Sequence, residues 1–486
     1  MNRNNCNVDN RMLSMLTDFY EITMANGYFK YGFKDKIATF DMFFRRVPDN
    51  GGFAIMCGLE QVIRHLEHLT FTDDDIKYLR DKEIFSEDFL SYIKSFRFSC
   101  NVWAVPEGTP VFPNEPLITV TGPVIQAQFV ETAILVYINH MSLIATKANR
   151  IARASKGRAV MEFGARRAQG CDAAILGARA SYIAGCAGTS NVLADQMFKI
   201  PALGTMAHSW VQMFDSEEDA FRAYAETYPD NCTLLVDTYN TLKSGVPNAI
   251  RVFNEVLVPK GYRPKGIRID SGDIAYLSKK ARKMLNDAGF EDCQICASNS
   301  LDEYIIKDLL SEGAEIDTFG IGEKLITASS EPVFGGVYKL VAVEKNGKFI
   351  PKIKISDNVT KITNPCQKEL WRLYDKETNK AIADVLTLID EVIDDSKPYI
   401  IFDPDNTWKK KEITNFKAVR LRKKIFDKGM LVYTLPSTEE IRNYCKEQIG
   451  TLWSEVTRFD NPHKYYVDLS EPLWNIKNKL LNMNKK

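Results

Sequence analysis

The residues of this chain that are suited to chemistry follow short apolar runs. His208 and Ser209 come directly after Pro201-Ala-Leu-Gly-Thr-Met-Ala207, a run that predicts a buried strand. Parallel sheets carry their chemistry at the carboxyl ends of strands, so an imidazole and a hydroxyl at this point are suited to catalysis. A structural histidine that is hydrogen-bonded at a strand end has the same local pattern. Neighbouring segments therefore decide between the two interpretations.

Six further apolar segments between residues 156 and 324 end in the same way, and helical patterns separate them. This alternation indicates βα units and a parallel sheet, in which all the strand ends meet at one edge. The polar or glycine residues that follow these segments are Arg166, Arg167, Ser190, Asn191, Asp237, Thr238, Tyr239, Arg268, Asp270, Ser271, Gly272, Asp273, Ser298, Asn299, Gly320, Gly322 and Lys324.

Charge and small residues at the strand ends favour a phosphorylated sugar as substrate. Arg166, Arg268 and the later Lys339 supply positive charge, and Gly320 and Gly322 let backbone amides approach phosphates. Thr205, in the His208 block, adds a hydroxyl.

Carboxylates at two of these strand ends have the chemistry of metal or sugar ligands. Asp237, Asp270 and Asp273 could ligate Mg²⁺ directly or through water, or bind ribose hydroxyls. For Asp273 we expect a helix cap instead, because a helical pattern follows it.

Composition restricts the class of protein. The chain has 486 residues with 63 basic and 63 acidic side chains, so its net charge is zero and gives no reason to expect nucleic acid or a membrane surface as partner. The N-terminus lacks the apolar core of a signal peptide, and no uninterrupted apolar run has the length of a membrane span. We therefore expect a cytoplasmic protein.

Two conspicuous motifs are expected to be structural. Cys293-Gln-Ile-Cys296 has no second cysteine or histidine pair to complete a zinc site, so it is interpreted as a core strand with reduced thiols. Lys409-Lys-Lys411 predicts a solvated loop.

Three regions are expected from the change in pattern along the chain. Residues 1–140 predict an N-terminal α+β domain, residues 141–345 the α/β domain with the strand ends, and residues 346–486 a smaller C-terminal domain that packs near the first. A long helical pattern from Val124 to about Ala154 leads into the second region.

Five blocks, in this order, resemble the nicotinate phosphoribosyltransferase family of type II phosphoribosyltransferases. They are Thr17-Asp-Phe-Tyr20, Glu162-Phe-Gly-Ala-Arg-Arg-Ala-Gln-Gly170, Gly204-Thr-Met-Ala-His-Ser209, Arg268-Ile-Asp-Ser-Gly-Asp273 and Gly335-Gly-Val-Tyr-Lys-Leu340. The resemblance implies an enzyme, an ATP-dependent ligase or glycosyltransferase, that joins nicotinate to phosphoribosyl pyrophosphate in NAD salvage. It also implies an incomplete (β/α) barrel with an α+β domain built from the two ends of the chain.

Residue roles come with the resemblance. It implies that ATP phosphorylates His208, which leaves Asp237 as a candidate to hold the other ring nitrogen. Arg166 would pair with the nicotinate carboxylate, and Tyr20 of the partner subunit in a homodimer would stack on the pyridine ring. The residues implied to hold phosphoribosyl pyrophosphate and its Mg²⁺ are Thr205, Arg268, Asp270, Gly320, Gly322 and Lys339.

Substrate choice is argued at Ser190. Related nicotinamide enzymes have aspartate where this chain has Gly188-Thr-Ser190, and a carboxylate there would repel nicotinate, whereas serine would not. A buried Arg166 would further favour the acid. Nicotinamide or quinolinate as substrate, or a phosphosugar sensor without turnover, are the alternatives. Glu323 departs from the threonine of many relatives and is left outside the predicted site.

Overall fold

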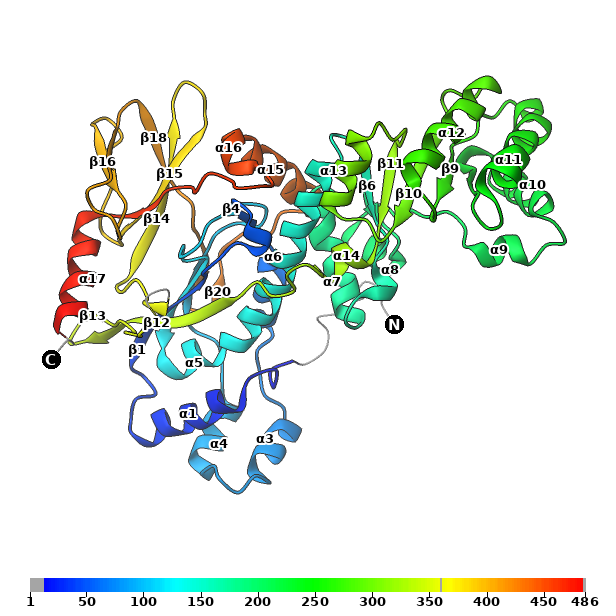
Figure 1. The fold of residues 1–486 in the computed structure, drawn as a ribbon. Coiled ribbons are helices and arrows are strands. Elements are labelled where there is room, and N and C mark those ends of the chain that lie inside the picture. The colour runs from blue at the N-terminus through cyan, green and yellow to red at the C-terminus, as the bar shows by residue number, and fades with distance from the viewer. Residues whose placement is uncertain (1–12, 359–360, 484–486) are drawn as a thin grey trace. The chain divides into compact units, whose positions relative to one another are not determined.

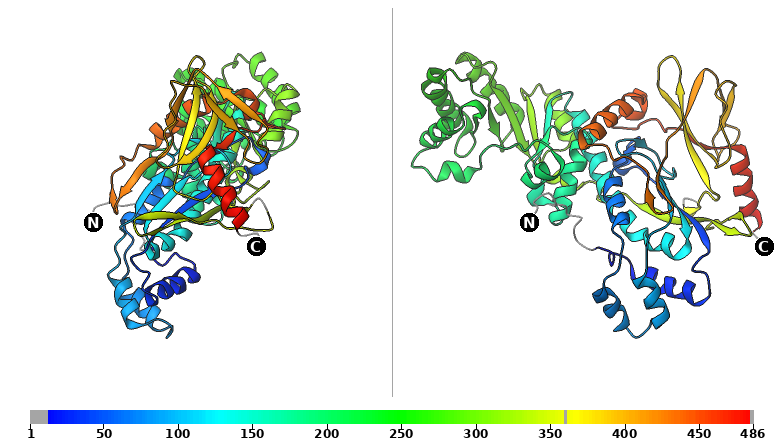
Figure 2. Two further views of the ribbon diagram at one scale, coloured as in Figure 1. Left: turned by 90° about the vertical axis from the view of Figure 1, so that its left-hand side faces the viewer. Right: turned by 180° about the vertical axis from the view of Figure 1, so that it is seen from behind.

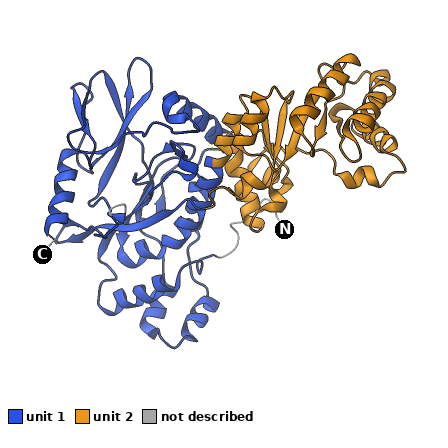
Figure 3. Ribbon diagram, in the orientation of Figure 1, with its two compact units in different colours: residues 1–146, 333–486 blue, residues 147–332 orange. Residues whose placement is uncertain are grey.

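The computed structural model describes residues 13–358 and 361–483. Its internal contacts divide the chain into two compact units, residues 1–146 with 333–486 and residues 147–332 (Figure 3). Both ends of the chain belong to the first unit. The predicted three-domain division, with boundaries at 140 and 345, stays a prediction.

The second unit is built on a six-stranded sheet in which every neighbouring pair is parallel. The strands, in sheet order, are β7 (Gly188–Thr189), β6 (Ala159–Glu162), β11 (Thr318–Ile321), β10 (Gln294–Asn299), β9 (Gly266–Ile269) and β8 (Thr233–Leu235) (Figure 1). Because the strands are parallel, their carboxyl ends lie at one edge. The predicted α/β class with a parallel sheet is confirmed for this unit.

Helices connect these strands, as parallel pairing requires. They are α7 (Cys171–Ile183), α8 (Val192–Phe198), α9 (His208–Gln212), α10 (Glu217–Thr227), α11 (Val246–Val252), α12 (Ile274–Asp287), α13 (Glu303–Ser311) and α14 (Glu323–Ile326). Local sequence fixes several starts: the Ser216 side chain caps α10 and the Asp273 side chain caps α12. The cap expected at Asp273 is thus confirmed.

One predicted strand is wrong. Residues 202–207, expected as a buried strand before His208, form a single parallel bridge between Ala202 and Thr189, and Ala202 and Gly204 are exposed. The segment is apolar in composition but short, and Gly204 has no neighbour around the position of a side chain. His208 therefore follows an open connection.

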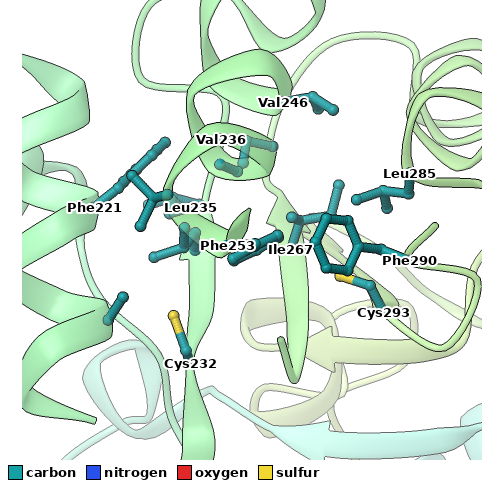
Figure 4. Packing of buried hydrophobic residues seen from close by; sticks show 14 of the residues in the cluster. Phe221, Cys232, Leu235, Val236, Val246, Phe253, Ile267, Leu285, Phe290 and Cys293 are labelled. Atoms are coloured by element: carbon teal, nitrogen blue, oxygen red, sulfur yellow. The ribbon is translucent and has the colours of Figure 1, made fainter. Parts of the chain in front are cut away.

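Behind β8 and β9, the second unit packs a hydrophobic cluster (Figure 4). Phe253 meets Phe290 edge to face at 5.6 Å between ring centroids, and both rings are buried. Cys293 is buried in the same cluster, and Cys296 is buried in β10. The interpretation of this cysteine pair as a core strand is confirmed.

The first unit joins the two ends of the chain in one antiparallel sheet of seven strands. In sheet order these are β13 (Lys348–Pro351), β12 (Gly336–Lys345), β1 (Ile37–Phe44), β5 (Ile118–Pro123), β3 (Asn101–Ala104), β19 (Lys423–Asp427) and β20 (Met430–Leu431). In this sheet Asp41 of β1 lies opposite Lys339 of β12. The pairing is long-range and was not predicted.

Smaller sheets complete this unit. A four-stranded sheet contains β18 (Phe416–Arg420), β14 (Lys368–Asp375), β15 (Ala381–Leu388) and β21 (Val467–Leu469). The two-stranded sheets are β16 (Tyr399–Phe402) with β17 (Lys410–Ile413), and β2 (Ala54–Ile55) with β4 (Pro110–Val111). Figure 2 shows the last helix, α17 (Glu471–Met483), which packs beside β15.

The remaining helices of the first unit are α1 (Phe19–Lys30), α2 (Leu59–Glu67), α3 (Asp73–Arg80), α4 (Glu87–Lys94), α5 (Val124–Phe129), α6 (Glu131–Ala154), α15 (Thr438–Gly450) and α16 (Ser454–Thr457). The helix α6 continues into the second unit. Within the described residues, the stretch Val124–Ala154 is long and apolar enough to cross a membrane by length and composition, although polar side chains interrupt its apolar run. Most of its apolar window is buried inside the protein, as in the core helix of a globular fold.

Candidate active site

His208 stands at the first position of α9, beside the carboxyl ends of the parallel strands. Its Nδ1 lies 3.1 Å from Oγ1 of Thr238, the third residue after the end of β8. Its Nε2 lies 4.0 Å from Asp237 Oδ1 and 3.9 Å from Asp270 Oδ2. The side chain is 40% exposed, so a substrate can reach the ring.

Asp237 does not make the predicted hydrogen bond to His208. Its Oδ2 accepts hydrogen bonds from the Asp270 N–H at 2.9 Å and from Ser271 Oγ at 2.6 Å. Its Oδ1 is buried and has no hydrogen-bond partner among the residues that the structure describes. The hydroxyl of Thr238, not the carboxylate, is the group that contacts the ring nitrogen.

Arg268 joins three strand-end segments. Its Nε donates to Ser298 Oγ at 2.7 Å, and its Nη2 donates to Asp270 Oδ1 at 2.7 Å. Its Nη1 donates to Thr205 Oγ1 at 3.2 Å and to the Met206 carbonyl at 3.4 Å. The structure thus brings Thr205, Arg268 and Asp270 together, as a shared role requires.

Asp270 is held in its ionised form. Burial acts to raise the pKa of its carboxyl, but the hydrogen bond from Ser298 and the charge of Arg268 outweigh burial, so the pKa lies below its ordinary value. A carboxylate results at neutral pH, next to a ring that can carry charge.

Arg166 and Ser190 come from the two strands at the other side of the sheet, β6 and β7. Arg166 lies in a short 3₁₀ turn, Ala165–Arg167, and is exposed. Ser190 is also exposed, and its N–H donates to the Glu162 carbonyl at 2.9 Å. The expectation of a buried Arg166 is wrong for this chain, so the substrate preference argued from its burial loses that support.

Gly320 and Gly322 have a packing reason that the sequence did not reveal. A Cβ at Gly320 would lie 2.6 Å from the Phe163 ring, and one at Gly322 would lie 3.1 Å from the Phe163 carbonyl oxygen. The Phe163 ring in turn lies 5.8 Å from the Arg268 guanidinium. Glycine at 320 therefore lets Phe163 reach the arginine.

Glu162 was overlooked as a candidate because it sits inside an apolar block. Its side chain is fully buried, and it accepts hydrogen bonds from Thr189 Oγ1 at 2.6 Å and from the Gly164 N–H. Burial raises the pKa of this carboxyl, while the two hydrogen bonds oppose the rise. It ties the ends of β6 and β7 together, whereas Glu323 faces Arg167 at 4.0 Å.

Tyr20 and Lys339 belong to the first unit, where Glu131 contacts both. Lys339 Nζ lies 3.8 Å from Glu131 Oε1, and the hydroxyl of Tyr20 is hydrogen-bonded to the same carboxylate. Burial and the charges of Glu131 and Glu21 raise the pKa of Tyr20, and burial lowers the pKa of Lys339. These residues line a pocket of about 460 Å³. Glu131 was not predicted, since it lies in a helical pattern without a motif.

No group of three or more histidine, cysteine, aspartate or glutamate side chains that could hold a metal ion occurs in residues 13–358 and 361–483. The acidic strand-end groups form a pair, Asp237 and Asp270, rather than a cage of ligands.

A histidine, two carboxylates and an arginine at the carboxyl edge of a parallel sheet define an enzyme site of the phosphate-handling α/β class. Three models of the nicotinate phosphoribosyltransferase family match the chain: its N-terminal domain at residues 15–139, the family itself at residues 158–389, and its C-terminal domain at residues 367–477. The chain belongs to the nicotinate phosphoribosyltransferase family.

Individual relatives agree with this membership. A nicotinate phosphoribosyltransferase of Bacillus subtilis is 46% identical over 467 residues, which cover 96% of this chain and 94% of the relative. The human nicotinate phosphoribosyltransferase is 32% identical, with 96% of each chain covered. The crystal structure of human nicotinic acid phosphoribosyltransferase has a TM-score of 0.85 at 30% identity and covers 96% of this chain and 99% of its own.

Proposed function

We propose that this protein joins nicotinate to phosphoribosyl pyrophosphate, giving nicotinate mononucleotide and pyrophosphate, with ATP as co-substrate in NAD salvage. Family membership over nearly the whole chain supports the activity. The observation that carries the mechanism is His208, held at Nδ1 by Thr238 and next to Asp270 and Arg268.

His208 is the proposed phosphoryl acceptor, and the reacting atom is Nε2. In this proposal Nδ1–H donates to Thr238 Oγ1, which leaves the lone pair on Nε2. An N–P bond forms at Nε2 while the bond from the γ-phosphorus to the bridging oxygen breaks, so ADP leaves. Attack of water at phosphorus later releases inorganic phosphate.

Phosphoribosyl pyrophosphate is proposed to lie against Arg268, Asp270 and Thr205. The arginine is anchored by three groups and 14% exposed, so little rotational freedom is lost on binding. The nicotinate nitrogen attacks the anomeric carbon as the bond to pyrophosphate breaks, through an oxocarbenium-like transition state. Charge on Arg268 stabilises the departing pyrophosphate. Gly320 and Gly322 border the site, with Phe163 between them and Arg268.

Mg²⁺ is proposed to arrive with the phosphate substrates. The unpaired buried Oδ1 of Asp237 and the carboxylate of Asp270, whose side chain is 33% exposed, are hard oxygen donors of the kind that Mg²⁺ binds through water. When bound, the ion neutralises phosphate charge. The chain's own contribution is to hold both carboxylates in place through Ser271 and Ser298.

Nicotinate, rather than nicotinamide or quinolinate, is the proposed acceptor. Ser190 leaves no negative charge at the end of β7, and the exposed Arg166 is available to pair with a carboxylate. Because Arg166 is exposed in this chain, we expect its ion pair with the substrate carboxylate to favour nicotinate over nicotinamide only modestly, unless a partner subunit covers the arginine.

The resemblance also supports proposals on assembly. We propose a homodimer in which the partner subunit supplies Tyr20 to the site, an incomplete barrel around the six-stranded sheet, and a cytoplasmic location. Measuring the mass in solution and mixing Tyr20→Ala with His208→Ala protein tests the first proposal. Partial recovery of activity in the mixture supports shared sites.

Labelling with γ-labelled ATP tests the central role of His208. We expect acid-labile phosphate on the wild type and none on His208→Ala, while the matched surface variant His68→Ala labels normally. Product formation without any labelled wild-type protein would show an uncoupled transferase. No product from nicotinate and phosphoribosyl pyrophosphate, with intact folding, would leave only a phosphosugar sensor.

A further inference from the structure

The first unit contains a second basic site, a cleft of about 860 Å³. The basic residues of its lining include Arg46, Lys409, Lys410, Lys411 and Lys464. We call it the lysine cleft. Lys410 and Lys411 begin β17, so the predicted solvated loop is wrong in part: these two lysines are exposed, but they stand on a strand.

The lining of the lysine cleft has more basic than acidic side chains, and its acidic members are Asp403, Asp405 and Asp468. Lys410 and Lys411 make no ion pair with any residue that the structure describes, whereas Lys464 interacts electrostatically with Asp403 and Asp468. The acidic Asp403 is occupied within its own turn, where it accepts from the N–H groups of Asp405 at 2.9 Å and Asn406 at 3.0 Å. In a chain of zero net charge, such an excess draws anions to this surface.

One of the acidic side chains in the lining weakens the positive excess only in part. Asp468 is 4% exposed, and burial together with the charge of Asp403 raises the pKa of its carboxyl to about 7. The charge of Lys464 opposes this rise, and near neutral pH the partly protonated side chain cancels less than one full positive charge.

Aromatic side chains give the cleft an apolar wall. Phe112 and Tyr465 stack at 3.8 Å between centroids, but both side chains are buried and offer little surface to a ligand. Tyr466 remains 42% exposed, with His463 edge-on at 5.7 Å. Its ring offers a face on which a flat heterocycle can stack. The volume lies in the range of sites for nucleotide-sized ligands.

From the unpaired lysines, the aromatic wall and the volume together, we propose that the lysine cleft binds a nucleoside polyphosphate. The phosphates contact Lys410, Lys411 and Lys464, and the base lies against Tyr466. This site goes beyond the proposed function, because all of its residues belong to the first unit, whereas His208 and Arg268 belong to the second.

Equilibrium dialysis with the imido analogue of ATP tests the proposal on the full chain. The starting variant is Arg268→Ala, which removes the central group of the strand-end site, with folding checked by circular dichroism. We expect about one nucleotide bound per chain on this background. Adding Lys410→Glu and Lys411→Glu should weaken that binding by at least about tenfold, because two attractive charges become repulsive.

A matched pair controls for overall charge. Lys417→Glu with Lys423→Glu makes the same change on exposed lysines of β18 and β19 that do not line the cleft, and should leave binding within about twofold. Absence of nucleotide from the Arg268→Ala protein, or equal loss in both lysine pairs, overturns the proposal. Inorganic triphosphate is the competitor: displacement as strong as by ATP itself overturns the nucleoside part.

Discussion

Thr238 Oγ1 lies 3.1 Å from His208 Nδ1, while the neighbouring Asp237 points its paired oxygen at Ser271 and the Asp270 N–H. Two successive residues that follow β8 thus have different roles. Thr238 orients the imidazole, and Asp237 holds the residues that follow β9. The hydrogen-bonded group that orients the ring is neutral, which suits the proposed transfer of a phosphoryl group from ATP.

Removing the Thr238 hydroxyl should lower phosphorylation of His208. Thr238→Val keeps the shape but loses a hydrogen bond of about 1 kcal/mol, which predicts a roughly five- to tenfold lower rate of labelling by ATP. Thr238→Ser restores the hydroxyl and should label at nearly the wild-type rate. Equal labelling of the valine and serine variants would show that this contact does not orient the ring.

Adding a methyl group at Gly320 should destabilise the second unit. The new Cβ would lie 2.6 Å from the Phe163 ring, and overpacking of this kind costs about 1–3 kcal/mol. Thermal unfolding followed by circular dichroism measures the effect for Gly320→Ala. Gly204→Ala is the control, because nothing lies within 4 Å of that position, and an equal loss in both variants would contradict the packing argument.

Stability should fall as the pH rises from about 5 to 8, in part through Glu21. Burial raises the pKa of this carboxyl from its ordinary 4.5 to about 7, although Thr132 and Thr17 donate hydrogen bonds to it. The folded chain then binds a proton that the unfolded chain has lost, so this contribution is complete below about pH 4.5 and disappears above pH 7.

Glu21→Gln keeps a neutral side chain at every pH and should remove that part of the slope, about 2–3 kcal/mol between pH 5 and 8. Melting temperatures measured across this range, against the exposed Glu67→Gln, provide the comparison. Parallel curves for Glu21→Gln and the wild type would mean that the carboxyl titrates normally in the folded state.

Breaking the buried ion pair of the first unit should be severe. Arg372 donates to both oxygens of Asp384 at 2.8 and 2.6 Å, and both side chains are fully buried. Arg372→Met leaves a buried carboxylate without its cation, which costs about 3–5 kcal/mol.

The surface variant Arg64→Met breaks contacts to Glu60 and Glu67 at 3.8 and 3.5 Å and should cost at most about 1 kcal/mol. Urea unfolding of both variants gives the difference. Similar midpoints would show that Asp384 is satisfied without the arginine.

The sequence by itself determined where along the chain the parallel strands lie and that polar residues follow each of them. Apolar runs that each end in polar groups are a local property, because a strand buried on both faces must be apolar and its end must not be. Six of the seven predicted segments are strands of one sheet, and the caps at Ser216 and Asp273 follow from adjacent residues alone. Five sequence blocks, among them those around Tyr20, His208 and Arg268, indicated the family.

Only the tertiary structure decided which side chains meet. Thr238 rather than Asp237 contacts His208, Phe163 explains Gly320, and Glu131 contacts Tyr20 and Lys339. Each of these contacts joins residues that are 30 or more positions apart in the chain. Such contacts depend on how the strands are placed beside one another and on which oxygen atoms already accept other hydrogen bonds. The spacing of residues along the chain predicts neither the strand placement nor the hydrogen-bond partners, because the packing of the whole unit determines both.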